Sequence, residues 1–99
     1  MPTIYHIAEP DRWKPEAPAY EAESLAAEGF IHCSTAAQVP GVAAAFYACR
    51  TDLILLSIDA GAMADILVYE DLYEHGEDFP HVYGPIPMHA ITSAEAFSA

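Results

Sequence analysis

Histidines that lie close to hydroxyl-bearing residues are the feature of this sequence that points most directly to chemistry. His32 precedes Ser34 by two positions, and His81 precedes Tyr83 by two positions. Side chains two apart on a strand face the same way, so each pair presents an imidazole beside a hydroxyl. Such a pair suits a ribose or a carboxylate, although a single histidine is more commonly a core residue bonded to a backbone carbonyl. His6 adds a third imidazole, and we expect all three histidines to converge on one pocket.

Two further polar features have both a functional and a structural interpretation. Glu70 ends the otherwise apolar segment 66–70, where it is either an edge-strand residue facing water or a pocket base or ribose acceptor. Ser34 and Thr35 lie where a strand gives way to a helix. Free N–H groups at that point would bind an anion without a basic side chain, but plain helix capping explains the same residues.

Metal ligation and thiol catalysis are the competing uses of these residue types. The sequence has no HxxxH, HExxH or CxxC spacing, so it does not predict a metal site. Cys49 falls on the apolar face of an expected helix and is predicted to be a core residue. Cys33 has no helix N-terminus of its own and no basic neighbour to lower its pKa, so it is a weak candidate nucleophile. The residues of ligand type are His6, His32, Cys33, His81 and His89.

The charge balance limits the classes of partner. Three Lys and Arg residues stand against 15 Asp and Glu residues, giving a net charge of −12. Proteins that bind nucleic acid or anionic membranes use basic side chains, so we expect neither partner and predict a small-molecule ligand instead. Two cysteines, no signal peptide and no long apolar stretch predict a cytoplasmic protein, and the oligomeric state stays open.

The expected elements form a single domain over residues 1–99, since no linker or repeat interrupts the chain. A helix over 21–28 should end at Gly29, and a second helix should run from a capping box at 35–38 to about Arg50, with Val42, Ala45, Phe46 and Cys49 as its buried face. The unbroken apolar strand 53–59 predicts burial on both faces. The order of elements favours an α+β fold with a mixed or antiparallel sheet. The other expected strands are 3–7, 30–34, 66–71, 81–84 and 89–93, with an exposed acidic loop at 73–80 and a weakly specified tail.

Several blocks of the sequence resemble the DUF952 family, which comprises small, mostly bacterial proteins of uncharacterised function. The resemblance extends over residues 3 to 93. The blocks that carry it are Tyr5-His6-Ile7, the EGFIHCS block 28–34 with Gln38, Ile58-Asp59, Glu70 and the FPHVYGPI block 79–86.

The resemblance implies a fold similar to that of the ADP-ribosyltransferases, in which a split mixed sheet holds NAD in a central cleft. His6 matches the histidine that contacts a ribose, and His32 with Ser34 matches the position that helps to hold nicotinamide. Glu70 is the best match for the glutamate that stabilises the ribosyl cation, whereas the aromatic that stacks on nicotinamide has no clear counterpart unless Tyr83 serves. The chain lacks the several arginines with which the related RNA 2′-phosphotransferases bind phosphate.

Three functions follow as hypotheses. The first is a cleft that binds a nucleotide or similar small polar ligand, with NAD or an NAD fragment as the candidate, and that transfers or hydrolyses ADP-ribose with Glu70 and His81 as catalytic groups. The second is a non-catalytic module that binds a ligand or partner. The third is a His-ligated metal site.

Overall fold

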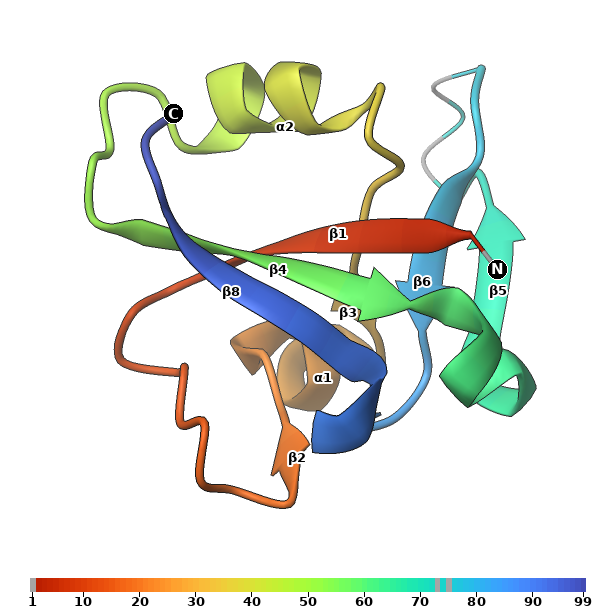
Figure 1. The fold of residues 1–99 in the computed structure, drawn as a ribbon. Coiled ribbons are helices and arrows are strands. Elements are labelled where there is room, and N and C mark those ends of the chain that lie inside the picture. The colour runs from red at the N-terminus through yellow and green to blue at the C-terminus, as the bar shows by residue number, and fades with distance from the viewer. Residues whose placement is uncertain (1, 73, 75) are drawn as a thin grey trace.

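The computed structural model describes residues 2–72, 74 and 76–99. Every pair of neighbouring strands in it is antiparallel. The strands form two three-stranded sheets, in the orders β1-β4-β8 and β3-β6-β5, and a small pair β2-β7. The bounds of the strands are β1 Thr3–Ala8, β2 Ala19–Tyr20, β3 Ile31–His32, β4 Leu53–Asp59, β5 Leu67–Glu70, β6 Phe79–Val82, β7 Ile86–Pro87 and β8 Ile91–Phe97. Two α-helices, α1 Glu23–Glu28 and α2 Val39–Phe46, and two 3₁₀ helices, η1 Ala60–Ile66 and η2 Met88–Ala90, complete the fold (Figure 1).

One isolated bridge joins the two larger sheets. The backbone groups of Tyr5 and Ser34 exchange two hydrogen bonds of 2.7 Å. The register of this bridge sets Ile7 opposite His32, but the carbonyl of His32 accepts from the imidazole of His6 at 2.6 Å. Strands β5 and β6 run at a steep angle to β1 and β4 in Figure 1. The result is an antiparallel sheet that is split where His6 lies, in agreement with the α+β class expected from the sequence.

Strand β4 lies at the centre of the first sheet, with a hydrophobic cluster on each of its faces. Leu56 and Ile58 belong to the larger cluster, against which Leu25 of α1 packs. Leu53 belongs to the smaller cluster, together with Ala43 of α2. Alternate residues of a strand face opposite ways, so the unbroken apolar run supplies both clusters. The predicted burial of β4 on both faces is confirmed.

The predicted buried face of the second helix is wrong for Ala45, Phe46 and Cys49, which are exposed, whereas Val42 packs against the core. Helix α2 ends at Phe46 and not near Arg50, and it buries Val39 and Ala43. Phe46 is 73% exposed, and Cys49 is exposed with a φ of 68°. The segment 42–46 is apolar all round, so helical spacing alone could not distinguish its two candidate faces.

Other boundaries also differ from those expected. The tail is not weakly specified, because β8 runs to Phe97 and pairs with Leu53 of β4. The second expected strand shortens to Ile31–His32, and the segment expected as a loop up to Pro80 instead starts β6 at Phe79. Of the expected acidic loop, residues 73 and 75 lie outside the described residues. Gly29 ends α1 in the left-handed conformation, as its position predicts. With eight residues in α2, no helix in the described part of the chain is long enough to span a membrane.

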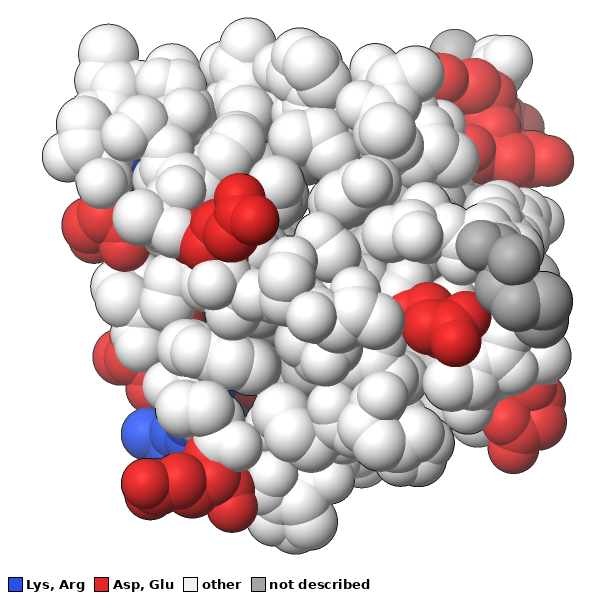
Figure 2. Space-filling view, in the orientation of Figure 1, with Lys and Arg blue, Asp and Glu red and all other residues white. Residues whose placement is uncertain are grey.

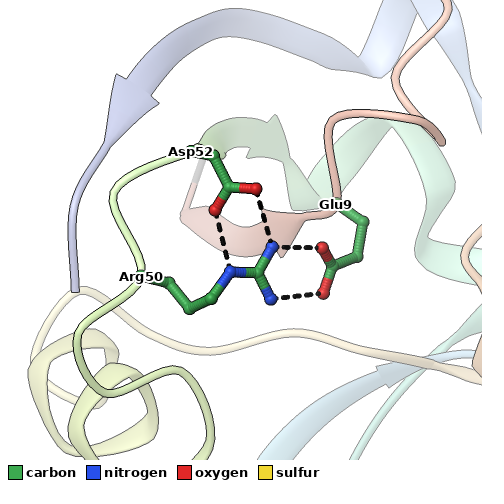
Figure 3. Close-up of polar contacts among 3 residues, drawn as sticks. All are labelled: Glu9, Arg50 and Asp52. Carbon is green, nitrogen blue, oxygen red and sulfur yellow. Dashed lines mark hydrogen bonds and ion pairs between the residues drawn. The ribbon is translucent and has the colours of Figure 1, made fainter.

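Arg50 connects three distant parts of the chain through hydrogen bonds. Its guanidinium donates to both carboxylate oxygens of Glu9, just after β1, and to both of Asp52, just before β4 (Figure 3). The shortest of these bonds are 2.7 Å to Glu9 and 2.8 Å to Asp52. The carbonyl of Arg50 also accepts from the N–H of Ala99. The side chains are partly exposed, so the network should act mainly at low salt.

Replacing Arg50 should loosen the C-terminal end of β8. We expect Arg50→Gln to lower Tm by a few degrees at low salt, with a smaller loss at high salt, because two carboxylates lose their shared cation. Hydrogen exchange at the amides near Phe97 should also become faster. Arg12→Gln is the matched control, since the exposed Arg12 forms no ion pair with any described residue. Equal losses of Tm in the two variants would contradict a specific role for Arg50.

Candidate functional site

The split between the sheets opens onto a groove of about 980 Å³. His32 and His81 lie directly opposite each other on β3 and β6, with ring centroids 5.5 Å apart. His6 reaches them from β1 through the backbone of His32. The three histidines therefore meet in one groove, as expected from the sequence. The predicted site residues that line it are His6, His32, Ser34, Glu70 and His81.

His6 is held between two fixed partners. Its Nδ1 lies 2.6 Å from the carbonyl oxygen of His32, which can only accept, so Nδ1 carries the proton. Its Nε2 then accepts from the hydroxyl of Tyr20 at 2.8 Å. Burial lowers the pKa of His6 to about 4 and raises the pKa of Tyr20. Both imidazole nitrogens are occupied, so this geometry gives His6 a positioning role and leaves no free nitrogen for the ligand contact expected from the sequence.

Glu70 and His81 form a carboxylate–imidazole pair. Oε2 of Glu70 accepts from Nδ1 of His81 at 2.9 Å and from the hydroxyl of Tyr83. The hydrogen bond from Tyr83, and then that from His81, lowers the pKa of Glu70, so the group is an ionised acceptor at neutral pH. Nδ1 of His81 therefore carries the proton. The ring of Phe30 lies 4.4 Å from that of His81 and covers it.

Two buried residues present open polar atoms to the groove. His81 is 2% exposed and Ser34 is 6% exposed, and both line the groove. Every fully buried side-chain nitrogen or oxygen among the described residues has a hydrogen-bond partner. No described residue bonds Nε2 of His81 or Oγ of Ser34, so both atoms are accessible to solvent, and both residues line the groove. In a neutral His81 with its proton on Nδ1, Nε2 offers a lone pair.

His32 lies at the rim of the groove. Its Nε2 is 3.0 Å from Oε2 of Glu28, and both side chains are more than two-fifths exposed. Its ring also contacts Phe30, with centroids 4.8 Å apart. These contacts orient the imidazole along the groove edge. The period-2 prediction for this segment is confirmed, since Ile31 and Cys33 point into the core.

Of the two interpretations of Ser34 and Thr35, the structure supports helix capping and not an anion site, because the N–H groups of both residues are bonded within the protein. The N–H of Ser34 donates to the carbonyl of Tyr5, and the N–H of Thr35 donates to Oε1 of Gln38 at 3.0 Å. The N–H of Gln38 donates in turn to the carbonyl of Thr35. Half of the expected capping box thus forms and uses the donors that an anion would need. The amide of Gln38 also donates to the carbonyl of Asp78, which holds the approach to β6.

Tyr83 does not line the groove. Its ring is 41% exposed and lies 5.4 Å from the ring of Phe30, while its hydroxyl bonds Glu70. The shared face of Tyr83 and His81, predicted from their spacing, brings the hydroxyl to the carboxylate and leaves the ring outside the groove. Tyr83 therefore supports Glu70 and is not placed to stack on a ligand in this groove.

Three residues of the site were not predicted from the sequence. Phe30 could have been found, since it shares a strand face with His32 and Ser34. Tyr20 follows a proline-rich loop with no periodicity, and Glu28 looked like an ordinary helix residue. No pattern in the sequence therefore indicated that either residue belongs to the site. Cys33 also lines the groove, but burial raises its pKa and keeps it a thiol. The described residues contain no group of three His, Cys, Asp or Glu side chains arranged to bind a metal ion.

Comparison with known structures places the fold among solved proteins. A crystal structure of protein CC0527 from Caulobacter crescentus is 28% identical, with a TM-score of 0.84 over 95% of this chain and 84% of that chain. A solution NMR structure of CC0527 is 29% identical, with a TM-score of 0.81 over 99% of this chain and 86% of that chain. No curated protein matches the sequence. The family model described as "Protein of unknown function (DUF952)" matches residues 7–94, and the chain therefore belongs to the DUF952 family.

Proposed function

We propose that the groove binds a small polar ligand of the nucleotide type and that Glu70 and His81 perform acid–base chemistry on it. NAD or an NAD fragment is the candidate ligand. The observation that carries the proposal is the carboxylate behind a buried imidazole whose Nε2 opens to the groove. In such a pair the carboxylate fixes the imidazole tautomer and stabilises the imidazolium that forms when Nε2 accepts a proton.

Hydrolysis of NAD is the reaction that this pair suits. A water held near Nε2 of His81 would attack the anomeric carbon of the nicotinamide ribose as the bond to the ring nitrogen breaks. The bonding electrons leave with nicotinamide, and the proton of the water passes to Nε2. Oε2 of Glu70 is taken by two donors, so Oε1, which no described residue bonds, is the oxygen left for a ribose hydroxyl. Ser34 supplies a second contact through Oγ.

A non-catalytic binding module is the second candidate. It is favoured by the number of polar groups that bond one another across the groove, since His6, Tyr20 and the carboxylate oxygen of Glu70 all have protein partners. Such bonds fix the shape of a binding site without requiring a reaction.

Titration of NAD, ADP-ribose and nicotinamide, followed by amide chemical shifts and by nicotinamide release, tests both candidates. We expect shifts at groove residues, and we expect Ser34→Ala to weaken binding by about 1–3 kcal/mol, the usual effect of leaving a buried polar partner unsatisfied. His89→Ala is the control, since His89 is exposed and does not line the groove. Binding without nicotinamide release would favour the module. Absence of groove shifts with all three ligands at millimolar concentration would refute the nucleotide proposal.

A further inference from the structure

We propose that the groove selects a small organic cation with an apolar body, and that it disfavours anionic ligands of the same shape. The inference deepens the proposed function, since it rests on the groove being a ligand site and says which part of NAD would enter it: the nicotinamide ring of NAD is a cation, whereas its phosphates would lie outside the acidic lining. Three independent features of the groove support it: the charge of its lining, the apolar character of one wall, and the acceptor chemistry of its open buried atoms.

Carboxylates dominate the charge of the lining. Six of the 15 acidic residues line the groove, whereas one of the three basic residues, Arg12, does so. Arg50 compensates Glu9 from outside the lining. On the face of the molecule in Figure 2, acidic side chains are scattered widely and basic ones contribute little. A ligand in the groove therefore experiences a negative potential. The six acidic residues are Glu9, Asp11, Glu23, Glu28, Glu70 and Asp71.

Apolar side chains form a second part of the lining, which we call the apolar wall. Phe46 on α2 turns away from the core and is exposed, yet it lines the groove, as does the half-exposed Leu72. Tyr47 and Phe79 add aromatic rings, and Val42 completes the wall. Burial against a ligand would remove this apolar area from water, and the aromatic faces can attract a cation. The wall gives an apolar ligand body a surface to cover.

The open buried atoms require donors from the ligand. Glu70 accepts a hydrogen bond from Nδ1 of His81, so Nε2 is an acceptor in the neutral imidazole, and His81 is almost completely buried. Oγ of Ser34, in a residue that is also more than nine-tenths buried, can accept as well as donate. An N–H-bearing cation satisfies Nε2 directly. This polar requirement is independent of the rim charge and points to the same class of ligand.

Anionic groups have few partners in the groove. The N–H groups of Ser34 and Thr35 are used within the protein, which leaves Arg12 as the one basic side chain in the lining. A phosphate or carboxylate placed there would meet like charges, and like-charge contacts cost binding free energy. The charged end of the preferred ligand is therefore positive.

Benzamidine, benzamide and benzoate form a matched test series, because they share one planar shape and differ in charge. We expect benzamidinium to shift amides of groove residues and to bind about tenfold more tightly than benzamide, in the range of one favourable ion contact at partial exposure. Benzoate should not shift groove amides. The affinity for benzamidinium should fall as salt is raised, since the rim charges are screened.

A pair of double variants separates local charge from net charge. Asp11→Asn with Glu23→Gln removes two carboxylates from the lining, whereas Glu16→Gln with Glu21→Gln removes two exposed carboxylates outside it. Both variants change the net charge equally. We expect the lining variant to weaken benzamidinium several-fold and the outside variant to change it less than twofold.

Each outcome decides between the two proposals. Benzamide or benzoate binding in the groove as tightly as benzamidinium would overturn the selection of cations and leave a ligand-binding groove in place. Equal weakening of benzamidinium binding by both double variants would show that the net charge of the protein attracts the cation and that the lining of the groove does not select it. If no probe in the series shifts the groove, the cation inference fails, and the titrations of NAD, ADP-ribose and nicotinamide decide separately whether the proposed function also fails.

Discussion

Acidification from pH 7 to pH 4 should lower the free energy of unfolding by about 3 kcal/mol through His6 alone. The pKa of His6 falls from 6.5 to about 4 on folding, chiefly because burial penalises the charged imidazole. Between pH 6.5 and about 4, the unfolded chain therefore binds a proton at His6 that the folded protein does not bind. Stability from this group is complete above pH 6.5 and is lost as the pH falls through the folded pKa, and the difference in pKa sets the size of the effect. Urea unfolding across this pH range measures it.

A matched substitution isolates His6 from the carboxylates that also titrate in acid. In His6→Asn the amide Nδ2 replaces Nδ1 as the donor to the carbonyl of His32, but the side chain no longer titrates. The variant should lose stability at pH 7, because the buried hydroxyl of Tyr20 loses its acceptor, and adding Tyr20→Phe should restore part of this loss. The loss between pH 6.5 and 4 should shrink by about 3 kcal/mol. His89→Asn, which replaces an exposed imidazole outside the groove in the same way, is the matched control. An unchanged slope in His6→Asn would show that other groups control acid stability.

Substitution of His81 should have the largest effect on any turnover of NAD. His81→Asn keeps a donor to Glu70 in place of Nδ1 and removes Nε2, the atom proposed to accept the proton. We expect kcat to fall by about 10²–10⁴-fold with little change in KM, since a general base acts in the transition state and not in ligand binding. Nicotinamide release under saturating NAD measures the effect.

The interpretation of that result depends on the fold and the pocket remaining intact. An unchanged Tm and unchanged ligand-induced shifts at groove residues would show that His81→Asn acts on the reaction alone. Full activity in His81→Asn would exclude Nε2 as the base. His89→Asn again serves as the control, because it removes an imidazole that does not line the groove.

Local patterns were sufficient to predict much of the framework. Strand alternation placed Ile31 and Cys33 in the core and His32 on the opposite face, and it placed His81 and Tyr83 together. The unbroken apolar run 53–59 predicted the central strand, and Gly29 predicted the end of α1. These predictions were confirmed because each depends on backbone periodicity or on the conformational freedom of one residue, which neighbouring residues already determine.

Features that depend on long-range contacts could not be predicted in the same way. The buried face of α2 was wrong, because a helix that is apolar all round is oriented by the sheet it packs on. The C-terminal strand was predicted over 89–93, but its extension to Phe97 was missed, because that end is stabilised by pairing with Leu53 at the far end of β4. Tyr20 was missed, because its role in the site is the hydrogen bond to His6, 14 residues away in the sequence.

The three histidines separate most clearly what the sequence determined from what the tertiary structure decided. Residue type and spacing led to the prediction that His6, His32 and His81 would face one groove, and all three line it. The partners of each ring then decided its chemistry. A carbonyl and a hydroxyl occupy both nitrogens of His6, whereas Glu70 holds the proton of His81 on one nitrogen and leaves the other open to the groove. Those partners come from strands and loops remote in sequence, and the protonation of an imidazole depends on which groups the fold brings within hydrogen-bonding distance.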